Sequence, residues 1–229
     1  MPRHVRGYDA QVAYEYLSKR DRKLGAWMKK VDKLENGPIP TDPRWRKAFD
    51  PVDALARAIL YQQLSGKAAS TIVGRVETAI GSSRLHFDTL GRCDDPTLRG
   101  CGVSGNKLLA LRDLAAREER GEIPDLRRMA TMDNDAIVAA LVPIRGIGRW
   151  TVEMMLMGRL GRPDILPVDD LGIRRGAQFV DKLEAMPAPK ELAEIGERWG
   201  PYRSYASLYL WRIADIGGGP KVATKRSQD

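Results

Sequence analysis

The sequence predicts an all-α fold made of two packed helical subdomains. Apolar residues recur at three- and four-residue spacing along most of the chain, which is typical of amphipathic helices. No segment shows the sustained apolar–polar alternation of strands joined by hairpin turns. The chain has 229 residues, of which 43% are hydrophobic. This length suits one large domain or two small helical subdomains around a sizeable core.

The first expected element is a helical segment over residues 1–40, with Trp27 and Met28 on its apolar face. Glycine and proline in the stretch Asn36-Gly37-Pro38-Ile39-Pro40 interrupt the helical pattern and predict a break there. We expect this segment to pack on the second subdomain and residues 41–215 to form the core.

Four further apolar repeats predict helices within the core. In chain order they are Val52-Leu55-Ala56-Ile59-Leu60, Ile72-Val73-Val76-Ile80 with Gly81 as a stop, Leu108-Leu111-Leu114-Ala115 with the charged run 117–120 before Gly121, and Leu192-Ile195-Trp199. The end of the chain is polar and basic, which predicts a tail over residues 216–229.

Charge and residue usage narrow the possible functions. The formal net charge of +8 favours a polyanionic partner such as nucleic acid or anionic lipid. No apolar run reaches the roughly 20 residues that span a bilayer, and no secretory signal pattern follows the N-terminus. Cys93 and Cys101 are too few to ligate an iron–sulfur cluster. His4 and His86 are the only histidines, and two are few for histidine-dependent nucleophilic catalysis or for a zinc site. We expect an intracellular protein with reduced thiols, no metal and no cofactor.

The most informative stretch is residues 141–152, Leu-Val-Pro-Ile-Arg-Gly-Ile-Gly-Arg-Trp-Thr-Val. A helix over roughly residues 135–141 is expected to run into a Gly-x-Gly turn, followed by a second helix over about 151–160. Glycine allows positive φ and close approach of a ligand. Backbone N–H groups at the start of the second helix can then bind a phosphate without any side-chain charge. Read alone, the glycine pair is equally compatible with an ordinary tight turn between helices.

The same stretch resembles the helix-hairpin-helix motif of the DNA glycosylase superfamily. That family places a catalytic aspartate about twenty residues beyond the hairpin, at the start of a helix, and this chain has Leu-Pro-Val-Asp-Asp-Leu-Gly-Ile at residues 166–173. Aligning Ile173 with the family's apolar position selects Asp170 as the catalytic carboxylate. Asp169 is then the residue available to cap the helix.

Two more segments resemble the 3-methyladenine DNA glycosylase II family, and the likeness covers roughly residues 45–215. Residues 61–69 look like the loop that enters the DNA minor groove, and residues 198–211 are similar to the family's C-terminal segment. The resemblance implies DNA contacts from Gln63, Leu64, Ser65, Lys67, Arg145, Gly146, Ile147, Gly148, Arg149 and Thr151. Gln63 and Leu64 both remain candidates for the wedge that fills the vacated stack, and Leu64 could equally be a core residue. The additional N-terminal sheet domain of larger bacterial members is not expected here.

The resemblance implies an enzyme that flips alkylated purines of the 3-methyladenine and 7-methylguanine type out of duplex DNA and hydrolyses their N-glycosidic bond. Trp150, Met154 and Trp211 are expected to line the base pocket. Trp150 stands where bifunctional relatives carry a nucleophilic lysine, so the enzyme should be monofunctional. The expected partner is damaged double-stranded DNA, bound by a monomer in the cytoplasm (nucleoid) or in a nucleus. A non-catalytic DNA-binding module and a glycosylase for other damaged bases remain alternatives.

Overall fold

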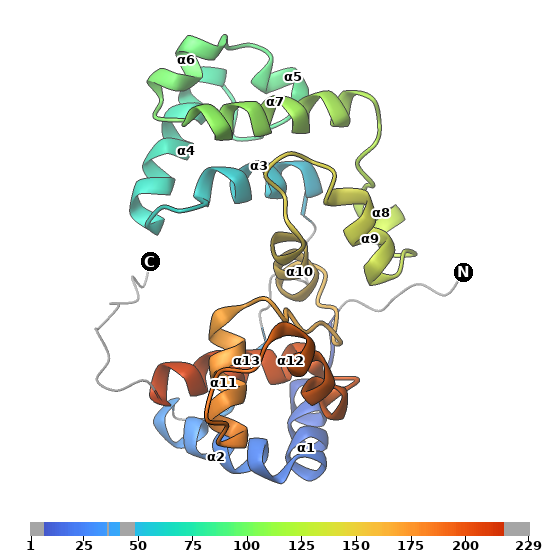
Figure 1. Cartoon of the computed structure of the whole chain (residues 1–229). Helices are drawn as coiled ribbons and strands as arrows, with labels where there is room; N and C mark the ends of the chain where they lie inside the picture. Colours follow the sequence, from blue (N-terminus) through green and yellow to red (C-terminus); the bar gives the residue numbers. More distant parts are fainter. Residues whose placement is uncertain (1–6, 36, 42–48, 218–229) are drawn as a thin grey trace. The chain divides into compact units, whose positions relative to one another are not determined.

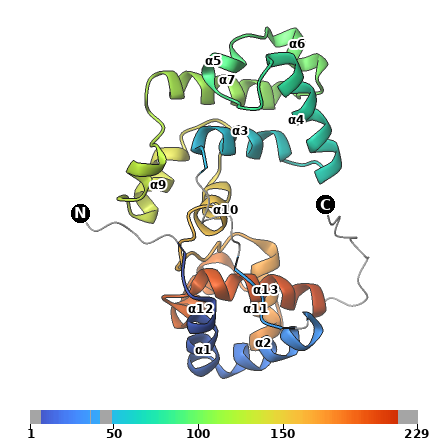
Figure 2. The same ribbon diagram turned by 180° about the vertical axis from the view of Figure 1, so that it is seen from behind.

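The computed structural model describes residues 7–35, 37–41 and 49–217, and these residues form helices and connecting loops without any strand. The chain divides into two compact units. The first comprises residues 1–5 and 47–154, and the second residues 6–46 and 155–229. Figures 1 and 2 trace the helices of each unit from opposite sides. The all-α prediction is confirmed, and none of the described helices combines the length and apolar character that crossing a membrane requires.

The first unit is built from seven helices and the start of an eighth among its described residues. They are α3 (Pro51–Tyr61), α4 (Gly66–Ile80), α5 (Phe87–Leu90), α6 (Asp95–Gly100), α7 (Gly105–Glu119), α8 (Leu126–Met129), α9 (Asn134–Leu141) and α10 (Arg149–Gly158), which continues into the second unit. Helix α7 packs against α3, α5 and α6. Its buried Leu108, Leu111 and Leu114 form the stripe that the three- and four-residue spacing predicts.

Local signals in the sequence determine where these helices begin and end. The Asp50 carboxylate accepts the N–H groups of Val52 and Asp53 at the start of α3, and proline occupies the first helical position. The Ser65 hydroxyl caps α4 in the same way. Gly81 follows α4 as its C-cap, and its left-handed φ of 65° is a conformation that glycine adopts without steric cost.

The second unit contains α1 (Ala10–Arg20), α2 (Arg22–Glu35), the end of α10, α11 (Leu171–Asp181), α12 (Pro189–Gly196), the short 3₁₀ helix η2 (Glu197–Trp199) and α13 (Arg203–Gly217). The pair α11 and α13 packs most closely, and α1 and α2 lie against it. A side chain at Gly176 would collide with the Leu210 carbonyl oxygen, at 2.2 Å from the added Cβ, so glycine lets these two helices approach. Met28 is buried and Trp27 half-buried among these helices.

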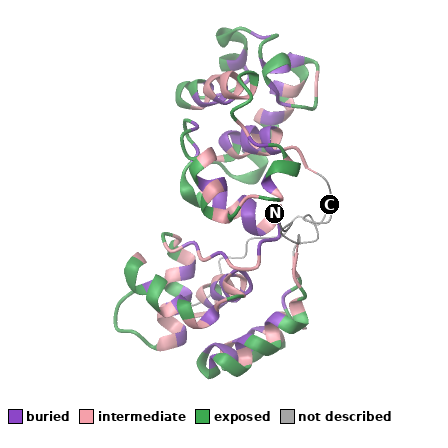
Figure 3. Ribbon diagram, turned by 90° about the vertical axis from the view of Figure 1, so that its right-hand side faces the viewer, coloured by how far each residue is buried: buried purple, intermediate pink, exposed green. Residues whose placement is uncertain are grey.

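Two boundaries differ from the sequence expectation. The repeat Leu192-Ile195-Trp199 does not form one helix, because α12 ends at Gly196 and Trp199 lies in η2. There the indole N–H of Trp199 donates to the buried carboxylate of Asp21 at 2.8 Å, so Trp199 also ties η2 to the α1–α2 junction. Helix α13 extends through Gly217, and residues 218–229 of the expected tail lie outside the described residues. In Figure 3 the helices carry buried residues on one side and exposed residues on the other.

Candidate active site

The Gly-x-Gly stretch forms a loop between α9 and α10, hereafter the hairpin loop (residues 142–148). Ile144 and Ile147 are buried at 2% and 3% exposure and anchor the loop in the first unit. Arg145, Gly146 and Gly148 are exposed between these anchors. Gly146 has φ +78°, the left-handed conformation for which the sequence pattern requires glycine. Buried anchors and exposed glycines together present the loop backbone to solvent.

Helix α10 starts directly after this loop. The Gly148 carbonyl accepts the N–H groups of Thr151 at 3.0 Å and Val152 at 3.3 Å, which are the first bonds of the helix. The N–H groups of Gly148 and Arg149 precede those bonds, at the positive end of the helix dipole. An exposed helix N-terminus of this kind is suited to bind a phosphate.

The Arg149 side chain has a role that the sequence did not suggest. Its Nε donates to Glu153 Oε1 at 3.0 Å, and its Nη2 donates to Asp135 Oδ1 at 3.2 Å. Burial lowers the Arg149 pKa, but Glu153 and Asp135 outweigh this effect and hold the pKa above its ordinary value. Arg149 thus links α9 to α10 and holds the two helices of the hairpin motif together.

The predicted minor-groove segment forms the loop between α3 and α4, hereafter the α3–α4 loop (residues 62–65). Gln63 and Leu64 are both exposed, so the interpretation of Leu64 as a core residue is wrong. Gln63 has φ +58°, an uncommon conformation for a non-glycine residue. Ser65 caps α4, and the exposed Lys67 makes no side-chain hydrogen bond or ion pair with described residues.

Asp170 lies at the start of α11 in the second unit. Its Oδ1 accepts the N–H of Ile173 at 3.0 Å, so Asp170 is itself the N-cap of α11. The expectation that Asp169 caps this helix is therefore wrong, and Asp169 is exposed. The same Oδ1 accepts the indole N–H of Trp211, on α13, at 2.9 Å. Two donors from different elements fix the orientation of this half-buried carboxylate.

The remaining predicted pocket residues lie on α10. Trp150 is in its first turn with 48% of its surface exposed, and Met154 follows one turn later, partly buried. Both belong to the first unit, whereas Asp170 and Trp211 belong to the second. A large exposed aromatic side chain is the type of group that stacks on a nucleobase.

Two residues of α7 that hold these loops were not among the predicted site residues. The Lys107 Nζ donates to the Leu60 carbonyl oxygen at the end of α3, at 2.7 Å. The Asp113 Oδ2 accepts the backbone N–H of Arg145 in the hairpin loop at 2.8 Å. Their positions in the sequence do not reveal which backbone groups they contact.

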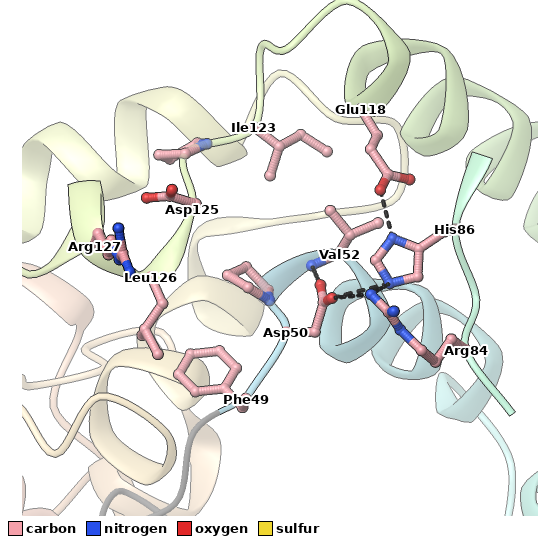
Figure 4. A pocket seen from close by; sticks show the side chains of 12 residues that line it. Phe49, Asp50, Val52, Arg84, His86, Glu118, Ile123, Asp125, Leu126 and Arg127 are labelled. Carbon is pink, nitrogen blue, oxygen red and sulfur yellow. Dashed lines mark hydrogen bonds and ion pairs between the residues drawn. The ribbon is translucent and has the colours of Figure 1, made fainter. Parts of the chain in front are cut away.

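A cavity of about 630 Å³ in the first unit is lined by none of the predicted site residues. Figure 4 shows the side chains that line it. The His86 ring lines this cavity. Its Nε2 lies 2.9 Å from Asp50 Oδ2, and its Nδ1 contacts Glu118 Oε1. Asp50 also caps α3. Because these polar groups are partnered with one another, the cluster ties the start of α3 to the end of α7 and is structural.

Comparison with known proteins assigns the family. Residues 56–201 match the family described as "HhH-GPD superfamily base excision DNA repair protein". Over 168 residues the chain is 33% identical to DNA-3-methyladenine glycosylase 1 of Schizosaccharomyces pombe, covering 73% of this chain and 74% of that relative.

Solved structures agree with this assignment. A DNA-3-methyladenine glycosidase from Bacillus halodurans superposes with a TM-score of 0.78 at 31% identity, covering 95% of this chain and 94% of that one. The Schizosaccharomyces pombe 3-methyladenine DNA glycosylase Mag1, solved in complex with abasic DNA, gives a TM-score of 0.74 at 31% identity, covering 91% and 99% of the two chains. These matches show that the chain, with its hairpin loop and capping aspartate, belongs to the HhH-GPD superfamily of base excision DNA repair proteins.

Proposed function

We propose that this protein is a monofunctional DNA glycosylase that flips alkylated purines out of duplex DNA and hydrolyses their N-glycosidic bond. One observation carries the proposal: Asp170, at the N-terminus of α11, presents a carboxylate held by Ile173 and Trp211, at the spacing from the hairpin loop where the family places its catalytic aspartate. The bond to Ile173 is an ordinary helix cap, so the spacing from the hairpin loop and the additional indole donor distinguish this carboxylate from a purely structural one.

The chemistry follows from the charge that develops on the sugar. Cleavage of an N-glycosidic bond passes through an oxocarbenium-like sugar. An ionised Asp170 stabilises that cation electrostatically and can orient the attacking water. Because the carboxylate is already held by two N–H donors, it need not reorganise when the charge appears.

An alkylated purine suits the aromatic residues of this chain. Such a base carries positive charge, so it leaves without a strong general acid. A cationic base also stacks favourably on an indole face, with a gain of about 1 kcal/mol. We assign this contact to the exposed Trp150, with Met154 beside it on α10 and Trp211 at the carboxylate. Since Trp150 stands where bifunctional relatives carry lysine, the product is an intact abasic site.

The DNA contacts are assigned to two exposed loops. The hairpin loop and the start of α10 would hold phosphates through the backbone N–H groups of Gly148 and Arg149, which precede the first hydrogen bonds of the helix. The wedge would come from the α3–α4 loop, where Gln63 can hydrogen-bond the orphaned base and Leu64 can fill the vacated space. We propose that a monomer binds damaged duplex DNA, in the compartment that holds the genome.

Base release from defined duplexes tests this function. Duplexes carrying one 3-methyladenine, 7-methylguanine, hypoxanthine or oxidised guanine are incubated with the protein, and the free base is quantified by chromatography. Release of the methylated purines, with strand breaks only after alkali, is expected. Release of the oxidised base alone would assign another lesion class, and duplex binding without release of any base would favour the non-catalytic alternative.

A further inference from the structure

One side chain joins the two DNA-facing loops of the first unit. The Nε2 of Gln62 donates to the carbonyl oxygen of Gly146 at 2.7 Å. Gln62 belongs to the α3–α4 loop and Gly146 to the hairpin loop, 84 residues further along the chain. Both loops lie in one compact unit, so this bond is internal to it.

Helix α7 holds both loops. Lys107 bonds the Leu60 carbonyl just before the α3–α4 loop, and Asp113 bonds the Arg145 N–H in the hairpin loop. Between them, the Ala110 Cβ lies 3.2 Å from where a Cβ on Gly146 would stand. Position 110 is three residues from both 107 and 113, so it is a neighbour of each on the helix surface. The loops therefore rest on a common support, and Gln62 is their direct link.

The conformation of the α3–α4 loop explains why a link is useful. Gln63 follows Gln62 directly and has φ +58°, a region that a non-glycine residue holds only when its surroundings impose it. On one side, Gln62 is tied to Gly146, and on the other, Ser65 caps α4. Without the Gln62 bond, the backbone before Gln63 and Leu64 loses its side-chain contact with the hairpin loop.

We propose that Gln62 is a positioning residue that sets the spacing between the wedge and the phosphate-holding hairpin, so that phosphate binding and wedge insertion occur in one preorganised geometry. The inference rests on the proposed function, because it concerns the flipping step of that reaction. Preorganisation of this kind lowers the barrier without adding any contact to the DNA. Gln62 touches neither base nor sugar in this account and acts through the loop that carries the wedge.

The test compares Gln62→Met with the wild-type protein. Methionine keeps the length and volume of glutamine but has no N–H to donate. Loss of one hydrogen bond of ordinary strength predicts a fall of about five- to tenfold in the single-turnover rate of base release. Affinity for undamaged duplex should change less than about twofold, because Asp113 and the buried isoleucines still hold the hairpin loop.

A matched control separates positioning from general destabilisation. Gln178→Met removes a side-chain amide that also donates to backbone carbonyls, those of Leu183 and Glu184 at the end of α11, away from both loops. Both variants are melted thermally and assayed on 7-methylguanine opposite cytosine and opposite thymine. Since a mispaired base costs less to flip, the Gln62→Met defect should shrink on the mispair.

A double-mutant cycle gives the decisive readout. If Gln62 acts through the wedge, adding Gln62→Met to a Gln63→Ala, Leu64→Ala protein should slow base release little further. A Gln62→Met rate equal to wild type, an equal defect on both pairings, or full additivity with the wedge variant would each overturn the proposal. A wild-type protein that releases no methylated base would instead reject the proposed function itself.

Discussion

The indole N–H of Trp211 donates to Oδ1 of Asp170 at 2.9 Å, across the interface between α13 and α11. The same oxygen accepts the backbone N–H of Ile173. Gly172 makes this contact possible, because a Cβ there would lie 2.8 Å from Trp211 Cδ1. Trp211 therefore holds the candidate catalytic carboxylate, in addition to any contact it makes with a base.

Trp211→Phe should slow base release because it keeps an aromatic ring and removes only the N–H. A hydrogen bond to a charged group is worth about 1.5–3 kcal/mol, which predicts a fall of at least about tenfold in the single-turnover rate. Trp27→Phe is the matched control, since Trp27 is a half-buried indole in the same unit whose ring contacts Phe179 and Lys30 rather than a carboxylate. If both substitutions slow the reaction equally, the Trp211 hydrogen bond is not the cause.

Asp170→Asn should abolish base release and leave the fold intact. Asparagine caps helices as well as aspartate does, so the bond to Ile173 survives and only the negative charge is lost. By analogy with other preorganised electrostatic sites, the rate should fall by roughly 10²–10³ or more. Duplex binding, measured by fluorescence anisotropy, should persist. Asp169→Asn is the control at an exposed neighbour, and equal losses from both variants would show that the wrong carboxylate was assigned.

The two hairpin glycines should respond differently to substitution. Gly148 has open space where a Cβ would stand, so Gly148→Thr keeps a capping residue at the start of α10 and adds bulk only on the exposed side. We expect unchanged thermal stability and weaker binding to damaged and undamaged duplexes alike. Gly146→Ala should instead lower the melting temperature, because φ is +78° and Ala110 is close. Loss of affinity for one lesion type alone would contradict phosphate binding by this loop.

The hold of Asp113 on the hairpin loop should depend on pH. Burial alone would raise the Asp113 pKa, but the Arg145 N–H and the Arg117 guanidinium outweigh it, so the pKa lies below its ordinary value. A carboxylate whose pKa is lowered by folding stabilises the folded protein at pH values above its ordinary pKa, near 3.8. This stabilisation is lost as the pH falls through the lowered pKa. Asp113→Asn should lower the free energy of unfolding by about 0.5–1 kcal/mol near neutral pH. Urea titrations should show this difference vanishing in acid, and a difference that grows in acid would reverse the assigned sign.

The protein should form no covalent complex with its DNA product. An indole cannot form an imine at position 150, and the Lys107 ammonium is held on the Leu60 carbonyl. Burial lowers the pKa of Lys107, but the hydrogen bond to the Leu60 carbonyl holds this amino group at the end of α3. Incubation with a methylated duplex and borohydride should trap nothing, and strands should break only after alkali. An adduct mapped to any lysine would make the enzyme bifunctional.

Local patterns in the sequence predicted the helices α3, α4 and α7 and the position of the hairpin. The apolar spacing of Leu108, Leu111 and Leu114 is enough to predict α7, because a helix must bury one face. The glycine pair between Ile144 and Arg149 predicts an exposed turn, because the backbone conformation it needs is local. The resemblance carried by these segments also pointed to Asp170, but local capping preferences could not separate it from Asp169.

Only the tertiary structure decided which side chains support these elements. Trp211 reaches Asp170 across 41 residues of sequence, and Gln62 reaches Gly146 across 84. Such pairs depend on how helices pack and on which rotamers the packing allows, and neither leaves a periodic trace in the chain. Residue spacing reports the local backbone, whereas a hydrogen bond between distant segments exists only once the core has brought them together.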